Sequence, residues 1–65
     1  MDYQRMAGEY LAEVDRLTRR VEQLRRSPRF RHEPDLWNRV GHLLEVRDDL
    51  RVTAHVLQRR AASCL

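Results

Sequence analysis

The apolar residues of the first arm of this chain recur in alternating steps of four and three. This regularity limits the possible folds more than any other feature. An α-helix turns once every 3.6 residues, so such a spacing places every member on one stripe of a helix. Alanine and valine fill the a positions of the heptad, and tyrosine and leucine fill the d positions. The stripe consists of Tyr3, Ala7, Tyr10, Val14, Leu17, Val21 and Leu24. The pattern predicts a helix over about residues 2–26.

A second stripe with the same spacing follows Pro34. It has leucine at every d position and one polar a position, Arg47. Proline is well tolerated as the first residue of a helix, and Asp35 then places negative charge in the electropositive first turn. The stripe consists of Leu36, Val40, Leu43, Leu50, Ala54, Leu57 and Ala61. It predicts a helix over about residues 34–61, with Glu33 as its N-cap.

Both prolines lie between the two stripes, Pro28 within residues 27–33 and Pro34 directly after them. Pro28 disfavours helical geometry at Ser27, so we expect the chain to turn back there. A three-helix arrangement would need a further break, and neither Gly8 nor Gly41 has a neighbouring turn residue. One continuous helix, kinked at the prolines, is the remaining rival. The sequence therefore predicts one all-α domain over residues 1–65, an antiparallel helical hairpin of two long helices.

A hairpin of 65 residues is too short to be comfortably stable alone. Its one cysteine, Cys64, cannot form an internal disulfide, and its three histidines do not combine with that cysteine at zinc-like spacing. Oligomerisation is the remaining source of stability. We therefore expect a homo-oligomer, with a dimer of hairpins forming a four-helix bundle as the favoured form.

Apolar side chains beside the two stripes support this expectation. Apolar a, d and e positions together suit a helix that has two neighbours in a bundle. The candidate oligomer interface consists of Leu11, Trp37, Leu44 and Val46. Val52 and Val56 lie four residues apart on the outer face of the second helix. They are either scattered surface valines or a stripe to which another protein docks.

Arg47 has two interpretations, because its a position is expected to face the seam. Its aliphatic stem can cover apolar surface while the guanidinium reaches the edge of the bundle. Alternatively, it is a buried arginine that pairs with Glu13 or a tyrosine hydroxyl and fixes the register of the helices.

The sequence gives little support for catalysis. His42, Glu45 and Asp49 share one side of the second helix and could approach one metal ion, but any amphipathic helix with a polar side has this spacing. Ser27, Ser63 and Cys64 have no histidine and carboxylate arranged beside them. We expect a protein that is not an enzyme and has no cofactor and no metal site.

The residues around the bend are strongly basic. Residues 25–32 contain four arginines and no acid, so they hold a charge of +4 and leave −1 for the rest of a chain whose net charge is +3. Arginine binds phosphate oxygens bidentately, and Phe30 or His32 could stack on an exposed base. The candidate contact residues for a protein or a nucleic acid are Arg25, Arg26, Arg29, Phe30 and Arg31.

Three interpretations of this segment remain open. It is a solvated turn in which Phe30 covers the end of the core against Leu24 and Leu36, a contact surface for a protein partner, or a contact surface for nucleic acid. No helix-turn-helix, zinc-finger or RNA-binding consensus is present. The sequence favours an interaction or adaptor module, with a nucleic-acid-binding regulator as the alternative.

Composition narrows the class of protein. The chain is 35% charged and 42% hydrophobic, with only two glycines. No window approaches the roughly 18 uninterrupted apolar residues of a membrane span. The first residues, MDYQRMAGEY, lack the basic-then-apolar order of a secretory signal. We expect a cytoplasmic protein without membrane contact.

Overall fold

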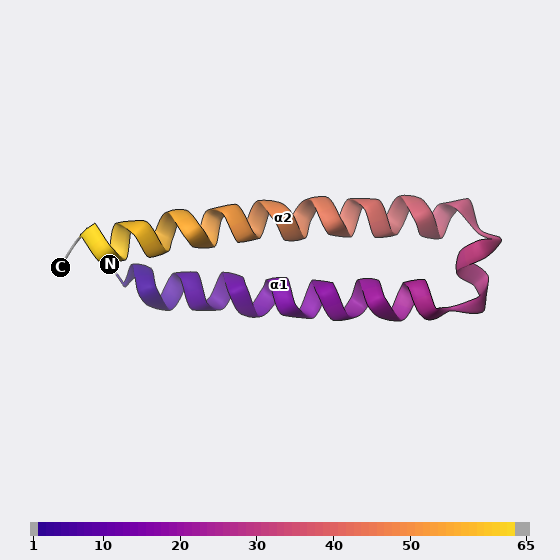
Figure 1. Ribbon diagram of the computed structural model, residues 1–65, viewed down its shortest axis with the longest axis horizontal. Helices are drawn as coiled ribbons and strands as arrows, with labels where there is room; N and C mark the ends of the chain where they lie inside the picture. Colours follow the sequence, from indigo (N-terminus) through magenta and orange to yellow (C-terminus); the bar gives the residue numbers. More distant parts are fainter. Residues whose placement is uncertain (1, 64–65) are drawn as a thin grey trace.

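The computed structural model describes residues 2–63, which form two antiparallel helices joined by a short bend (Figure 1). Helix α1 spans Tyr3–Arg26, the 3₁₀ helix η1 spans Pro28–Arg31, and helix α2 spans Pro34–Ser63. The predicted all-α hairpin is confirmed, and the single kinked helix is wrong. The molecule measures 51 × 14 × 13 Å, so each helix packs on the other along nearly its whole length.

Local contacts define both ends of α1, and only the break at its C-terminal end is predicted by the sequence. The Asp2 side chain accepts a hydrogen bond of 3.0 Å from the backbone N–H of Arg5, which caps the first turn. At the other end Ser27 is extended, with φ −64° and ψ 133°, because Pro28 disfavours the helical conformation there. Arg25 and Arg26 occupy the last turn, where positive charge favours the helix dipole.

The bend contains a 3₁₀ helix, η1, where the sequence predicts only a turn. The Ser27 hydroxyl accepts a hydrogen bond of 3.3 Å from the N–H of Arg29, and Pro28 supplies a helical φ at the first position. The N–H groups of His32 and Glu33 both donate to the Arg29 carbonyl, at 3.0 and 3.1 Å. A serine cap followed by proline thus starts a helical turn, which makes the bend a fixed structure instead of an irregular loop.

Helix α2 begins at Pro34, as its sequence suggests, and continues to Ser63, two residues past the expected end at 61. The Ser63 hydroxyl donates to the Arg59 carbonyl at 3.0 Å, which keeps the last turn helical. Gly41 lies inside the helix without a positive φ. The expected capping role of the Glu33 side chain is wrong, because both of its carboxylate oxygens bind Arg29.

The core between the helices is thin and made mainly of small side chains. Ala7 and Ala54 are the most deeply buried, with 1% and 0% exposure. The densest packing lies near the bend, where Val21, Leu24 and Val40 contact one another. Phe30, Leu36, Leu43 and Leu44 pack on this cluster as partly buried residues, which confirms that Phe30 covers the end of the core. Within residues 2–63 the buried residues are Ala7, Val14, Val21, Leu24, Val40, Ala54 and Leu57.

Candidate interaction surfaces

The half-buried residues of the two stripes define the first surface. Within the pair of helices the small a residues are buried, whereas most of the larger d residues remain half-buried. We call this surface the d-face, and its members are Tyr3, Tyr10, Leu17, Leu36, Leu43 and Leu50. The small residues therefore form the contact between the two helices, and the tyrosine and leucine side chains lie at the edge of that contact.

The d positions of both helices lie on the same side of the hairpin. In a right-handed helix the d residue is rotated by a fixed angle from the a residue, and reversing one helix puts the two d rows on one edge. The structure agrees, because Tyr10 of α1 and Leu50 of α2 line one surface hollow of about 270 Å³ together with Met6. Glu9 and Glu13 complete the lining of this hollow. Tyr10 and Leu50 of the d-face thus lie beside one hollow at the edge of the hairpin.

The four predicted interface residues do not all lie at the d-face. Val46 is half-buried at a g position, beside the d-face. Leu11 and Leu44 occupy e positions, on the opposite edge, and Leu44 already packs on the cluster near the bend. Trp37, also at an e position, is 48% exposed. Residue spacing assigns the a and d rows equally to the seam, so the sequence does not single out the d-face as the row that is left exposed.

Arg47 follows the first of its two interpretations. Its side chain is 22% exposed, so most of the aliphatic stem is covered. The Nε and Nη2 atoms donate to Asp48 Oδ1 at 3.1 and 3.0 Å, at the surface of α2. Glu13, the proposed partner in the alternative, is paired with Arg16 instead. The buried register-setting pair is therefore not formed within the hairpin.

The outer face of α2 carries the two isolated valines. Val52 is 64% exposed and Val56 is half-buried. Both lie off the d-face, at f and c positions, and are flanked by polar neighbours such as Asp49 and Arg59. Val52 is therefore available at the surface of the hairpin, as both interpretations of the two valines require.

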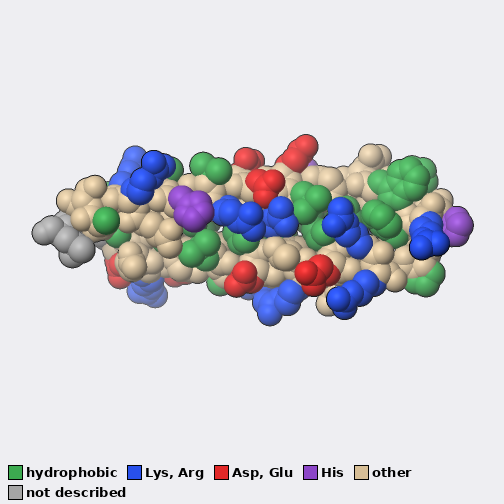
Figure 2. Space-filling view, in the orientation of Figure 1, with side chains coloured by type: hydrophobic (Ala, Val, Ile, Leu, Met, Phe, Trp, Pro, Cys, Tyr) green, Lys and Arg blue, Asp and Glu red, His purple; other side chains and the backbone are tan. Residues whose placement is uncertain are grey.

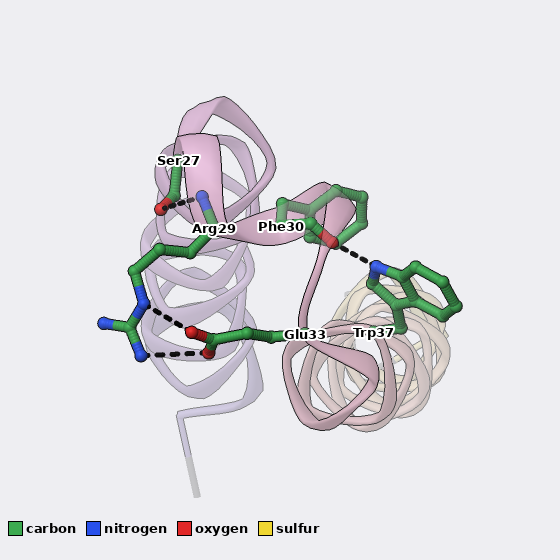
Figure 3. Close-up of polar contacts among 5 residues, drawn as sticks. All are labelled: Ser27, Arg29, Phe30, Glu33 and Trp37. Atoms are coloured by element: carbon green, nitrogen blue, oxygen red, sulfur yellow. Dashed lines mark hydrogen bonds and ion pairs between the residues drawn. The ribbon is translucent and has the colours of Figure 1, made fainter.

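At the bend, Arg29 is held by a bidentate contact with Glu33 (Figure 3). Arg29 Nε and Nη2 donate to Oε1 and Oε2 at 2.7 and 2.9 Å, which is the fork geometry of a strong charge-assisted pair. The pair spans η1 and joins it to the start of α2. Arg29 is thereby neutralised and used structurally, although it belongs to the predicted contact residues. The four-residue spacing indicates such a pair only within a helix, and residues 27–33 are expected to form a turn.

The same contact shifts the pKa of both partners. The hydrogen bond from Arg29 lowers the pKa of Glu33 below its ordinary value, and the bond to Glu33 raises the pKa of Arg29. A carboxyl group with a lowered pKa stabilises the fold above its ordinary pKa and loses that contribution as the pH falls through the lowered value. The pair therefore supports the bend at neutral pH and releases it in acid.

We expect Arg29→Gln to raise the pKa of Glu33 toward that of a free glutamate, because it removes the hydrogen bond and the positive charge. A carbon-detected NMR titration of the Glu33 carboxyl measures this directly. Arg31→Gln is the matched control, since it removes an arginine from the same 3₁₀ helix and leaves the pair intact. Equal pKa values in the wild type and in Arg29→Gln would contradict the contact.

Trp37 belongs to the bend as well as to α2. Its indole N–H donates to the Phe30 carbonyl, and its ring meets the Phe30 ring edge-on, with centroids 6.5 Å apart and planes at 61° (Figure 3). The indole is therefore fixed in place while almost half of its surface faces solvent. Residue spacing predicts Trp37 only as part of the oligomer interface. Its contact with Phe30, seven residues earlier, follows from the path of the bend.

The remaining arginines of the bend surround an open hollow of about 470 Å³. Three of them, Arg25, Arg26 and Arg31, line it without any acidic residue, and none of the three forms an ion pair within residues 2–63. The hollow is completed by Ser27, Pro28, Phe30 and His32. In Figure 2, basic groups and a histidine are visible at the bend end of the molecule, whereas the acidic groups of that face lie farther along the helices.

Other kinds of site find no support in the described part of the chain. Residues 2–63 contain no group of three or more histidine, cysteine, aspartate or glutamate side chains placed to hold a metal ion, so His42, Glu45 and Asp49 form no such group. Neither α1 nor α2 has a stretch that is both long and apolar enough to cross a membrane. Cys64 lies outside the described residues.

Comparison of the chain with protein-family models, with curated proteins and with solved structures gives no match. The function is therefore argued from the hairpin itself.

Proposed function

We propose that the protein is a small non-enzymatic interaction module that works as a homodimer, in which two hairpins pack their d-faces together as a four-helix bundle. The observation that carries this proposal is the d-face, where six tyrosine and leucine side chains are half-buried, whereas most of the residues at the a positions are buried. A second copy offers a complementary strip, because a two-fold contact brings the same surface from both partners.

The surface area of the hairpin is consistent with a missing partner. The chain exposes 5230 Å², whereas a compact monomer of this mass exposes about 4,400 Å². The difference is about 800 Å², which matches the area that each partner typically buries in a stable protein–protein interface. The larger exposed area follows from the elongated shape, because a rod with a thin core cannot cover its own apolar edge.

The absence of buried polar groups supports a role in binding over one in catalysis. No residue in the range 2–63 is both polar and buried, and the shifted pKa values belong to the exposed pair Arg29 and Glu33. Catalytic groups ordinarily depend on burial or on closely placed charges to shift their pKa. In a dimer joined through the d-faces, the e edges, the outer face of α2 and both bends stay available to further partners.

Sedimentation equilibrium at micromolar concentration tests the proposal. We expect a mass of twice the 7.9 kDa of the chain, because a single hairpin of this length gains only about 3–5 kcal/mol from its own core. The melting temperature of a dimer should also rise with protein concentration. A monomer with a cooperative, concentration-independent melt would overturn the dimer and leave the d-face without an occupant.

A further inference from the structure

The bend presents positive charge that the hairpin does not use. Arg29 is neutralised by Glu33, but Arg25, Arg26 and Arg31 line the hollow and form no ion pair or side-chain hydrogen bond within residues 2–63. The C-terminal dipole of α1 explains two of them. It does not explain Arg31, which lies beyond the helix, nor the lack of acids in the lining of the hollow.

The bend also presents a rigid aromatic ring. The N–H of Trp37 is already satisfied by the Phe30 carbonyl, so a partner would meet the ring as a flat apolar surface and not as a hydrogen-bond donor. Phe30 supports the indole edge-on, and Phe30 itself is anchored on the core cluster. A ring held in this way loses little conformational entropy when a partner stacks on it.

Part of the charge lies on the same side of the molecule as the ring. Arg25 is an e residue of α1 and Trp37 is an e residue of α2, and antiparallel packing brings the two e rows to the edge opposite the d-face. Phe30 connects them, since it contacts the indole and also lines the hollow. Only the Phe30 ring therefore separates a flat ligand on Trp37 from the arginine-lined hollow.

We propose that the bend binds single-stranded nucleic acid, with one base stacked on Trp37 and the neighbouring phosphates held by Arg25, Arg26 and Arg31. Stacking on an aromatic side chain beside basic groups is the usual chemistry by which proteins bind single strands without sequence preference. An acidic peptide would also satisfy the arginines, but it would have no use for a flat exposed ring. A duplex keeps its bases stacked inside and could use only the charge.

This site is complete in one hairpin and does not rest on the dimer. The d-face, on the other edge, can be occupied by a second copy while both bends remain open. A dimer would carry two such sites, so its affinity for a long strand should exceed that for a strand which reaches only one bend.

Trp37 is the only tryptophan, so its fluorescence reports the site in the unmodified protein. We expect oligo(dT) and oligo(U), at about 50 mM salt, to quench this fluorescence in a saturable titration. Three phosphate contacts should give a slope of about −2 in log affinity against log salt concentration, at roughly −0.7 per contact for single strands. Comparison of the two oligonucleotides shows whether the site distinguishes DNA from RNA.

Variants separate the two halves of the site when binding is followed by the anisotropy of a labelled oligonucleotide. The triple change of Arg25, Arg26 and Arg31 to glutamine should weaken binding at least tenfold and flatten the salt slope. Trp37→Ala should weaken binding by about tenfold with the salt slope kept, since stacking is not ionic. The charge-matched control changes Arg51, Arg59 and Arg60, which are exposed and lie in the half of α2 farther from the bend, and should keep most of the affinity. Circular dichroism melts confirm that each variant is folded.

Three outcomes would overturn the site. No quenching and no anisotropy change at 50 mM salt excludes nucleic acid, because even nonspecific electrostatic binding is visible there. An equal loss in the charge-matched control means that net charge, and not the bend, attracts the strand. Equal quenching by poly-glutamate, an acidic polypeptide without bases, assigns the bend to a protein partner instead.

Discussion

Leu24→Ala should lower the free energy of unfolding by about 2–4 kcal/mol, the usual cost of a cavity left by a buried leucine. Leu24 is 9% exposed and lies in the densest part of the core, between Val21 and Val40. A domain of this length has a total stability of about 3–10 kcal/mol, so the loss is a large share of it. Thermal or urea melts at a fixed protein concentration measure the effect.

Val52→Ala is the control for this cavity, because Val52 is 64% exposed and lies outside the core. Its replacement should change the stability by less than about 0.5 kcal/mol. If Val52→Ala cost as much as Leu24→Ala, Val52 would have to lie in an interface, and the outer face of α2 would replace the d-face as the contact surface.

Leu17→Glu should convert the proposed dimer to monomers. Leu17 lies in the middle of the d-face, so its replacement would place a charge opposite the same apolar strip of the second copy. An unpaired charge in such a contact is costly, and we expect the dissociation constant to rise a hundredfold or more, roughly 3 kcal/mol. Sedimentation equilibrium across a concentration series measures this directly.

Leu11→Glu is the matched control, since Leu11 is also a half-buried leucine of α1 but lies at an e position, on the opposite edge. It should leave the dimer largely intact. Dissociation by Leu11→Glu, with Leu17→Glu still dimeric, would show that the hairpins meet through the e edge. That result would restore the interface inferred from the sequence and would bring Trp37 into it.

The heptad spacing of the apolar residues predicts most of the fold. The unbroken alternation of four- and three-residue steps from Tyr3 to Leu24 predicts a helix, because no other regular backbone geometry puts those side chains on one stripe. Pro28 and Pro34 mark where the first helix ends and the second begins, since each restricts its own φ and the conformation of the residue before it. These are local effects, and local effects can be read from a sequence.

Contacts across the bend and between the helices cannot be predicted from local effects. Glu33 has the right position for a cap, yet its carboxylate turns to Arg29, because η1 brings the two side chains together. Trp37 reaches the Phe30 carbonyl for the same reason, which makes its indole part of the bend. Its place in an oligomer interface stays a prediction.

The sequence by itself determined two amphipathic helices, the bend between them and a cluster of positive charge at that bend, since each follows from residue spacing and backbone restriction. Only the tertiary structure decided which apolar row is left exposed and which arginines are free. The heptad assigns a and d equally to the seam. The helices, however, pack closely on their small a residues, so that Tyr10, Leu17 and Leu50 remain at the edge. Exposure and charge pairing depend on the distance between segments, and that distance is set by packing.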